Sequence, residues 1–307
     1  MTPSLAPFSW VPLLHFPIEW AALSLLACAC LYWERAGFSG IGIEGCAAAA
    51  TLGLILGFEW TGQYPLAVAL AAGFAVTFAL VAGALLQIAR ADMAIGSFAL
   101  SLVPLCGLGL LTRSGPFAIF DAKPSPGLVR GTIFDGTYAE DLIANPILLA
   151  APLLVALAGW ILWRTPFGLR LRAFGENPEF RVPKSSPTAH RFGGLAAGAL
   201  LATPAAALLL NAHPGSPPAG LGLIALGCVI AGRWSLVAAI LLAVGPALLR
   251  TGRPYAEALG GSSGFGGFGI VAEMAPFFLV LLYLVFLARR ALRLAPTSQS
   301  RLDPDTL

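Results

Sequence analysis

The stretch that decides the fold is Tyr64-Pro-Leu-Ala-Val-Ala-Leu-Ala-Ala-Gly-Phe-Ala-Val-Thr-Phe-Ala-Leu-Val-Ala-Gly-Ala-Leu-Leu-Gln-Ile-Ala89, which contains no charged side chain. A bilayer core about 30 Å thick is crossed by roughly 20 apolar residues in a helix. The whole chain of 307 residues has the same character, being 58% hydrophobic and only 11% charged. Soluble domains carry about 25% charged residues. The composition therefore predicts a polytopic membrane protein and argues against a large soluble α/β core.

Eight further apolar segments lie on either side of this run. We expect an all-α fold with about nine transmembrane segments. They are Pro17–Trp33, Glu44–Trp60, Tyr64–Ala89, Ala94–Leu111, Pro146–Trp163, Arg191–Asn211, Gly220–Gly232, Trp234–Arg250 and Ile270–Ala288. Glu44–Trp60 and Gly220–Gly232 are short for a full crossing. Irregular backbone at membrane depth needs surrounding protein or a water cavity, so both are expected to be broken helices at the centre of the bundle.

The distribution of Lys and Arg predicts the orientation. Nine crossings with the C-terminus inside and the N-terminus outside place thirteen of the 18 Lys and Arg residues in inside loops, as the positive-inside rule favours. We expect one transmembrane domain over 1–307, with a cytoplasmic loop over 164–190 and extracytoplasmic loops over 112–145 and 251–269.

Few residues are suited to chemistry. The five cysteines lie in apolar runs without metal-ligand spacing, and no His lies near another plausible ligand. No Ser/His/Asp grouping or H-E-x-x-H motif is present. The formal net charge of +3 is no signal for nucleic acid. We therefore expect no enzyme, no metal site, no cofactor bound by this chain and no nucleic-acid partner.

One polar, basic segment interrupts the apolar runs, from Arg164 to Arg181. It can form a short amphipathic helix in which Phe167, Leu169, Leu171 and Phe174 offer apolar contacts to a partner. Gly175 can end this helix, with Pro178 as a stop just beyond. The alternative is a solvated basic loop that merely satisfies the positive-inside rule.

Glu44 is the most informative single residue. An ionisable group inside a transmembrane segment is costly and usually faces a cavity or a partner. The alternative is capping of its own helix, because a carboxylate is favoured at the positive helix N-terminus. Gly40–Ala47 and Gly220–Gly227 are weakly alike and each precedes a short segment, which suggests two pseudo-repeated halves. Chance similarity between Gly-, Ala- and Leu-rich segments is the alternative.

Three blocks together resemble the permease subunits of ABC importers, in the branch for sugars, nucleosides and branched-chain amino acids. Glu34–Gly45 resembles the entry motif E-R-x-G-x-x-N-I-G-x-E-G, and Thr165–Pro178 resembles the cytoplasmic signature T-x-F-G-x-x-L-R-A-x-G-E-N-P. Gly220–Trp234 resembles G-x-G-x-I-A-L-A-x-x-I-x-G-x-W. The chain departs from the family pattern in having Gly40 in place of Asn and an atypical run over 180–187.

The resemblance implies that 1–307 is a single permease domain of the vitamin-B12-importer type (type II) in the bacterial inner membrane, most similar to those for nucleosides or simple sugars. It implies alternating access, a second permease subunit (identical or homologous), a cytoplasmic ATPase that holds the ATP and Mg, and an extracytoplasmic substrate-binding protein. The residues implied in ATPase coupling are Arg164, Phe167, Gly168, Leu169, Arg170, Arg172, Ala173, Gly175, Glu176, Asn177 and Pro178. Those implied in the translocation pathway are Gly42, Glu44, Gly45, Gly220 and Gly222.

A secondary transporter or channel without an ATPase partner is the competing interpretation. It would account for broken helices but would leave the basic segment Arg164–Arg181 without a partner to recognise it. It also requires more ionisable groups within the membrane than Glu44 supplies.

Overall fold

A computed structural model describes residues 15–114, 145–176, 186–212, 219–252 and 268–287. Within these ranges every regular element is helical. The longer helices are α1 (Phe16–Arg35), α2 (Ile43–Thr61), α3 (Tyr64–Ala89), α4 (Met93–Ser114), α6 (Pro146–Arg164), α8 (Pro187–Ala212) and α13 (Phe268–Leu287). The shorter ones are η2 (Gly40–Gly42), α7 (Pro166–Glu176), α9 (Leu221–Ala231), α10 (Leu236–Leu242) and α11 (Val244–Thr251). The predicted all-α class is confirmed.

The helix ends follow from local sequence. Proline occupies the first turn of α1, α3 and α6, where its missing N–H costs nothing. Asn145 caps α6 by accepting from the N–H groups of Ile147 (3.1 Å) and Leu148 (3.4 Å). Gly62, with φ of 64°, ends α2 in the left-handed region, which favours glycine.

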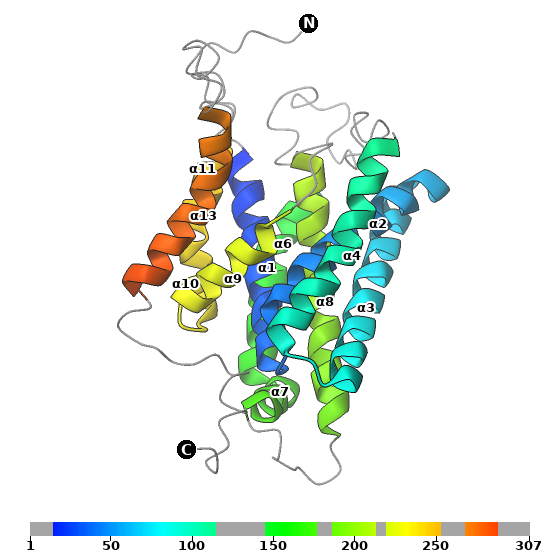
Figure 1. The fold of residues 1–307 in the computed structure, drawn as a ribbon, viewed down its shortest axis with the longest axis vertical. Helices are drawn as coiled ribbons and strands as arrows, with labels where there is room; N and C mark the ends of the chain where they lie inside the picture. Colours follow the sequence, from blue (N-terminus) through cyan, green and yellow to red (C-terminus); the bar gives the residue numbers. More distant parts are fainter. Residues whose placement is uncertain (1–14, 115–144, 177–185, 213–218, 253–267, 288–307) are drawn as a thin grey trace, which may run out of the picture.

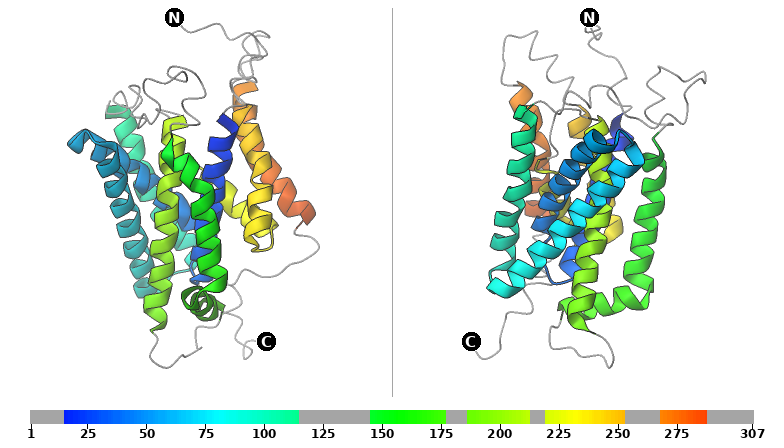
Figure 2. Two further views of the ribbon diagram at one scale, coloured as in Figure 1. Left: turned by 180° about the vertical axis from the view of Figure 1, so that it is seen from behind. Right: turned by 90° about the vertical axis from the view of Figure 1, so that its right-hand side faces the viewer.

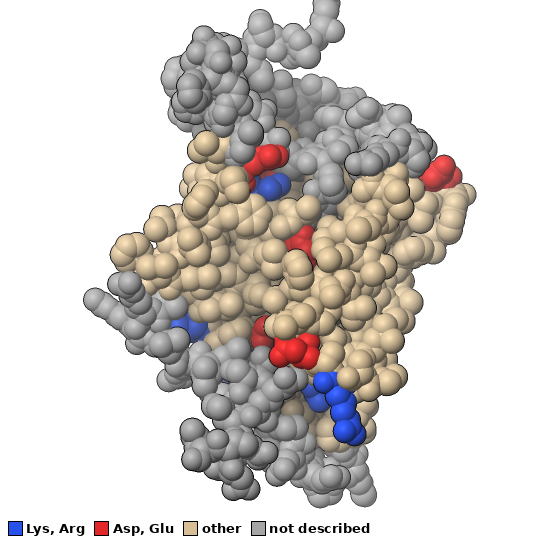
Figure 3. All heavy atoms as spheres, viewed as in Figure 1, with Lys and Arg blue, Asp and Glu red and all other residues tan. Residues whose placement is uncertain are grey.

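Most of the long helices form one bundle, in which they run up and down (Figures 1 and 2). Most residues of α1, α2 and α8 are buried, whereas most residues of α3, α4 and α6 are half-buried or exposed. Those exposed side chains are large and apolar, for example Ile88, Leu110 and Leu153. Figure 3 shows one face, where a broad and largely uncharged band, with acidic atoms visible near its middle, lies between charged groups nearer the two ends. An apolar surface of this kind is suited to lipid.

Six helices among the described residues are long and apolar enough to cross a membrane. Three further apolar stretches are shorter: Leu221–Ala231, Leu236–Thr251 and Glu273–Phe286. The predicted number of nine crossings therefore stays a prediction.

Two expectations about the short segments have different outcomes. Gly220–Gly232 is indeed short, since α9 has 11 residues and occupies only part of the bundle's length in Figure 1. The expectation that Glu44–Trp60 is a broken helix is wrong, because η2 extends α2 into a continuous 22-residue span from Gly40. The predicted segment began at Glu44 and so left out the glycine-rich turn Gly40–Gly42, whose residues are helical and largely buried.

The predicted crossing Trp234–Arg250 is interrupted. It consists of α10 and α11, which meet at Ala243, three residues before Pro246. Proline has no N–H to donate and its ring crowds the preceding turn, which explains the break.

Several helices also outrun the predicted segments by a few residues. α4 continues to Ser114, and α8 begins at Pro187, four residues before Arg191. Polar residues can extend a helix beyond the apolar core of a bilayer, so hydropathy alone underestimates helix length.

Candidate functional site

A buried junction joins the start of α2 to the start of α9. Glu44, which is 4% exposed, accepts a hydrogen bond at Oε2 from the N–H of Gly222 (2.7 Å) and another at Oε1 from the N–H of Gly220. The first N–H groups of a helix have no partner within that helix. Glu44 supplies that partner from a helix distant in sequence, so it fixes the N-terminus of α9.

The capping interpretation of Glu44 needs a correction. Its own helix α2 has Gly42 as N-cap and no side-chain cap hydrogen bond. Glu44 instead caps α9, by accepting from Gly220 and Gly222, which lie 176 and 178 positions further along the chain. The sequence analysis names Glu44, Gly220 and Gly222 among the pathway residues, and the structure brings these three residues together.

The junction depends on glycine at two positions. A Cβ on Gly222 would lie 2.8 Å from both the backbone N and Oε2 of Glu44, closer than real Cβ contacts allow. Gly220 has φ of 82°, which side chains rarely adopt. The other two predicted pathway glycines serve different contacts: Gly42 packs on the Trp33 ring and Gly45 packs on Phe78.

α1 contributes a second buried carboxyl group beside this junction. Glu34 is 4% exposed and accepts at Oε1 from the N–H of Gly40 (2.8 Å). The thiol of Cys30 lies between the carbonyl oxygens of Gly40 (3.7 Å) and Gly222 (3.9 Å). The ends of α1, η2 and α9 are thus held together by polar contacts within an apolar core.

The basic segment lies at one end of the bundle. It forms α7, which crosses that end between the last turn of α6 and the first turn of α8 (Figure 2). The predicted short helix is confirmed over Pro166–Glu176. Asn177 and Pro178, also predicted for coupling, lie outside the described residues.

The side chains of α7 divide into two faces. Leu169 and Arg170 are exposed, as is Arg164 just before them. Leu171 and Phe174 are 0% and 1% exposed, so the expectation that they offer apolar contacts to a partner is wrong. They hold α7 on the bundle instead, whereas Leu169, 51% exposed, is free to meet another protein.

Two glycines of α7 make close backbone contacts. A Cβ on Gly175 would lie 2.1 Å from the carbonyl oxygen of Arg35, and one on Gly168 would lie 2.3 Å from that of Ile161. Gly175 does not end the helix as expected, because α7 continues to Glu176. Its role in the fold is to let α7 approach the C-terminus of α1.

Ring contacts and hydrogen bonds stabilise the position of α7 and of the helix ends beside it. The guanidinium of Arg172 lies 4.3 Å from the ring centroid of Trp163. From α8, His190 packs on the rings of Phe167 and Phe174. Arg191 donates to the carbonyl oxygens of Ala36 (2.8 Å) and Gly37 (3.1 Å) at the end of α1.

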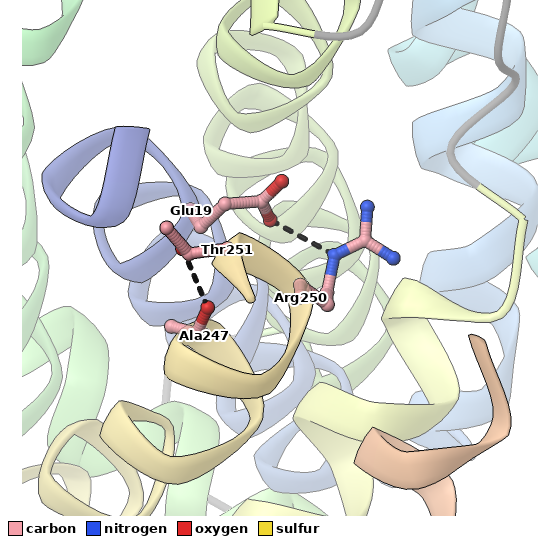
Figure 4. Close-up of polar contacts among 4 residues, drawn as sticks. All are labelled: Glu19, Ala247, Arg250 and Thr251. Carbon is pink, nitrogen blue, oxygen red and sulfur yellow. Dashed lines mark hydrogen bonds and ion pairs between the residues drawn. The ribbon is translucent and has the colours of Figure 1, made fainter. Parts of the chain in front are cut away.

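Sequence reasoning missed one buried carboxylate. Glu19 of α1, with a side chain 1% exposed, forms an ion pair with Arg250 of α11, Oε2 to Nε 2.9 Å (Figure 4). Thr251 donates to the carbonyl oxygen of Ala247 beside them (2.8 Å). A signal was available, since both residues lie near ends of predicted segments on the same side of the membrane.

A cavity of about 550 Å³ lies apart from the Glu44 junction. Residues of α1, α6 and α10 line it, among them Trp20, Val155 and Ile240, and no lining side chain is charged. None of the five predicted pathway residues lines this cavity, so it does not mark the predicted pathway.

A bundle of apolar helices with a half-length helix capped inside it, and with an amphipathic helix across one end, is typical of a multi-pass membrane transporter. The chain belongs to the family described as the permease component of branched-chain amino acid transport systems, which matches residues 18–288.

Two relatives make the comparison more specific. The chain is 29% identical over 247 residues to the guanosine ABC transporter permease protein NupQ of Bacillus subtilis (strain 168), covering 72% of this chain and 74% of that protein. It is 35% identical over 95 residues to the nucleoside ABC transporter permease protein NupC of Lactococcus lactis subsp. cremoris (strain MG1363), covering 29% and 30%. No solved structure matches.

The resemblance stated from the three sequence blocks is confirmed. The chain is a membrane-spanning permease subunit of an ABC importer. The competing interpretation, a secondary transporter or channel without an ATPase, is thereby set aside.

Proposed function

We propose that this chain, as one permease domain over 1–307, carries nucleosides across the bacterial plasma membrane by alternating access. The observation that carries the substrate class is the similarity to the guanosine permease along most of the chain. The chain itself catalyses no covalent chemistry and binds no cofactor. ATP and Mg are held by a separate ATPase.

The proposed complex contains a second permease subunit, a cytoplasmic ATPase and an extracytoplasmic substrate-binding protein. The N-terminus lies outside and the C-terminus inside, because this orientation places most Lys and Arg residues on the inner side. The end of the bundle that carries α7 is then the cytoplasmic end. The loops over 112–145 and 251–269 face outward, where the binding protein delivers substrate.

α7 is the element through which the ATPase acts in this proposal. Its exposed side chains Leu169 and Arg170, with Arg164 before them, offer one apolar contact and two guanidinium groups to a groove in the partner. Its buried side chains hold it to α1, α6 and α8. A push on the exposed face therefore moves the bundle and not α7 alone.

The substrate test uses the chain with its partners in proteoliposomes, with radiolabelled guanosine supplied through the binding protein. We expect uptake of labelled guanosine to require ATP. Unlabelled nucleosides should reduce this uptake by competition, whereas ribose and leucine should not. A complex with a hydrolysis-deficient ATPase is the control. Competition by ribose or leucine, with no effect of nucleosides, would contradict the substrate class.

The coupling test uses Gly175→Val and Arg172→Ala. Both should leave the permease inserted and assembled while ATP hydrolysis continues with little uptake, because α7 no longer sits on Arg35 and Trp163. Arg90→Lys, at the exposed C-terminal end of α3, is a matched control. Normal uptake by both α7 variants would contradict a coupling role.

A further inference from the structure

A continuous path of buried contacts leads from α7 to the N-terminus of α9. It begins where Gly175 packs against the carbonyl oxygen of Arg35. This contact is so close that a Cβ on Gly175 would lie only 2.1 Å from that oxygen. No side chain intervenes at this point, so a displacement of α7 acts directly on the backbone of α1. Arg191 ties the next two carbonyl groups, those of Ala36 and Gly37, to α8.

The second step runs from the end of α1 to the start of α2. Glu34 holds the N–H of Gly40 at 2.8 Å, and the Trp33 ring packs against Gly42 so closely that a Cβ there would lie 2.1 Å from it. The Trp33 indole N–H is itself fixed by the carbonyl oxygen of Leu195 in α8 (3.1 Å). Close packing and short polar contacts transmit displacement because neither can be compressed cheaply.

The third step runs from α2 to α9. Glu44 lies four residues after Gly40, about one helical turn, and both of its carboxyl oxygens accept from backbone N–H groups of Gly220 and Gly222. The Cys30 thiol makes a parallel contact with Gly40 and Gly222. Every partner in this step is a peptide group, so the contacts define where the backbone of α9 begins.

We propose that Glu34 and Glu44 are positioning residues that pass a displacement of α7 to the N-terminus of α9. The proposal rests on the proposed function, because it assumes that the ATPase moves α7. The half-length helix α9 is then the element that opens or closes the pathway, and the two carboxyl groups set its position in each state. Neither carboxyl group needs to touch the substrate.

The experiment follows the two ends of the path separately in the reconstituted complex with its ATPase and binding protein. Cys106 is the exposed native cysteine among the described residues and is replaced by serine. An environment-sensitive fluorophore is attached at Ala189→Cys, exposed near α7, or at Ile230→Cys, 36% exposed on α9. The fluorescence change on adding ATP is measured together with the ATP hydrolysed per nucleoside taken up.

In the complex without further changes, both probes should respond to ATP. Glu44→Ala should keep the response at 189 and reduce that at 230 by about fivefold or more, the size of a typical coupling free energy. The ATP consumed per nucleoside should rise by a similar factor. Glu34→Ala should act in the same direction. Glu59→Gln, which removes an exposed carboxylate from the other end of α2, is the matched control and should change neither probe.

Glu44→Gln covers the case in which Glu44→Ala does not fold. It keeps one carbonyl acceptor and should give an intermediate response at 230. A full response at 230 in either Glu44 variant overturns the relay but leaves the proposed function intact. Absence of ATP-dependent uptake and of any response at 189 in the complex without these variants overturns the proposed function, and the relay with it.

Discussion

Glu44 and Glu19 are both buried carboxyl groups in apolar helices, but they are satisfied by different kinds of partner. Glu44 accepts from backbone N–H groups at the start of α9. Glu19 accepts from the side chain of Arg250, which is 24% exposed at the end of α11. A guanidinium on a flexible stem can follow a moving helix, whereas a peptide N–H moves only with its backbone.

The two carboxyl groups are therefore suited to different roles. Glu44 fixes the relative position of two backbones, which suits an element that transmits movement. Glu19 joins α1 to α11 through an adjustable contact, which suits a link that tolerates movement.

The largest effect is expected for Glu44→Ala. It leaves the N–H groups of Gly220 and Gly222 without their acceptor at buried or half-buried positions, and each such loss costs about 1–3 kcal/mol. We expect the permease to lose about 2–4 kcal/mol of stability, measured by thermal unfolding in detergent. Glu59→Ala, at an exposed site on the same helix, should be close to neutral. A loss no larger than that of Glu19→Ala would contradict the comparison.

Gly222→Ala tests the same junction from the side of α9. The added Cβ would lie 2.8 Å from the backbone N and Oε2 of Glu44, so one of the two helices must shift, at about 1–3 kcal/mol. Gly73→Ala is the matched control, because nothing lies within 4 Å of its Cβ position. That control should be neutral or slightly stabilising, as alanine favours a helix over glycine. Equal melting temperatures for the two variants would show that the junction is not tightly packed.

The sequence predicted much of this arrangement. The lack of charge in the long runs predicted the helical class, and the polar interruption predicted α7. The glycine-rich start of Gly220–Gly232 predicted a short helix. Glu44 was singled out because an ionisable side chain inside an apolar segment is costly unless it has a partner. Each of these rests on composition within one segment, which can be judged without knowing its neighbours.

What could not be predicted depends on contacts between distant segments. That Glu44 caps α9 and not α2 requires two helices about 180 residues apart in sequence to meet. That Leu171 and Phe174 face the bundle depends on which side of α7 lies against α1 and α8. The amphipathic pattern defines an apolar face but does not say whether the chain itself or a partner covers it.

The pair Glu19 and Arg250 should give a smaller effect. Arg250→Gln removes the guanidinium that pairs with the buried carboxylate of Glu19 and should cost about 1–2 kcal/mol. Glu19→Gln should cost less, because Arg250 is partly exposed and can turn toward water. The double variant should be no worse than Arg250→Gln alone, with a coupling free energy of about 0.5–2 kcal/mol. Strictly additive losses in thermal unfolding would show that the two groups do not interact.

The smallest expected effect is a difference in how the stability contributions of the two carboxyl groups respond to salt. Arg250 borders solvent, so ions can screen its attraction to Glu19, whereas the partners of Glu44 are neutral peptide groups inside the bundle. Raising NaCl from about 0.05 M to about 0.5 M shortens the screening length to a few ångströms. The stability difference between the unchanged protein and Glu19→Gln should then shrink by a few tenths of a kcal/mol, within the range of exposed ion pairs. The difference between the unchanged protein and Glu44→Gln should stay constant. A salt response at Glu44 as large as that at Glu19 would mean that ions reach the α2–α9 junction. The junction would then be part of an open, water-filled pathway and not a closed mechanical contact.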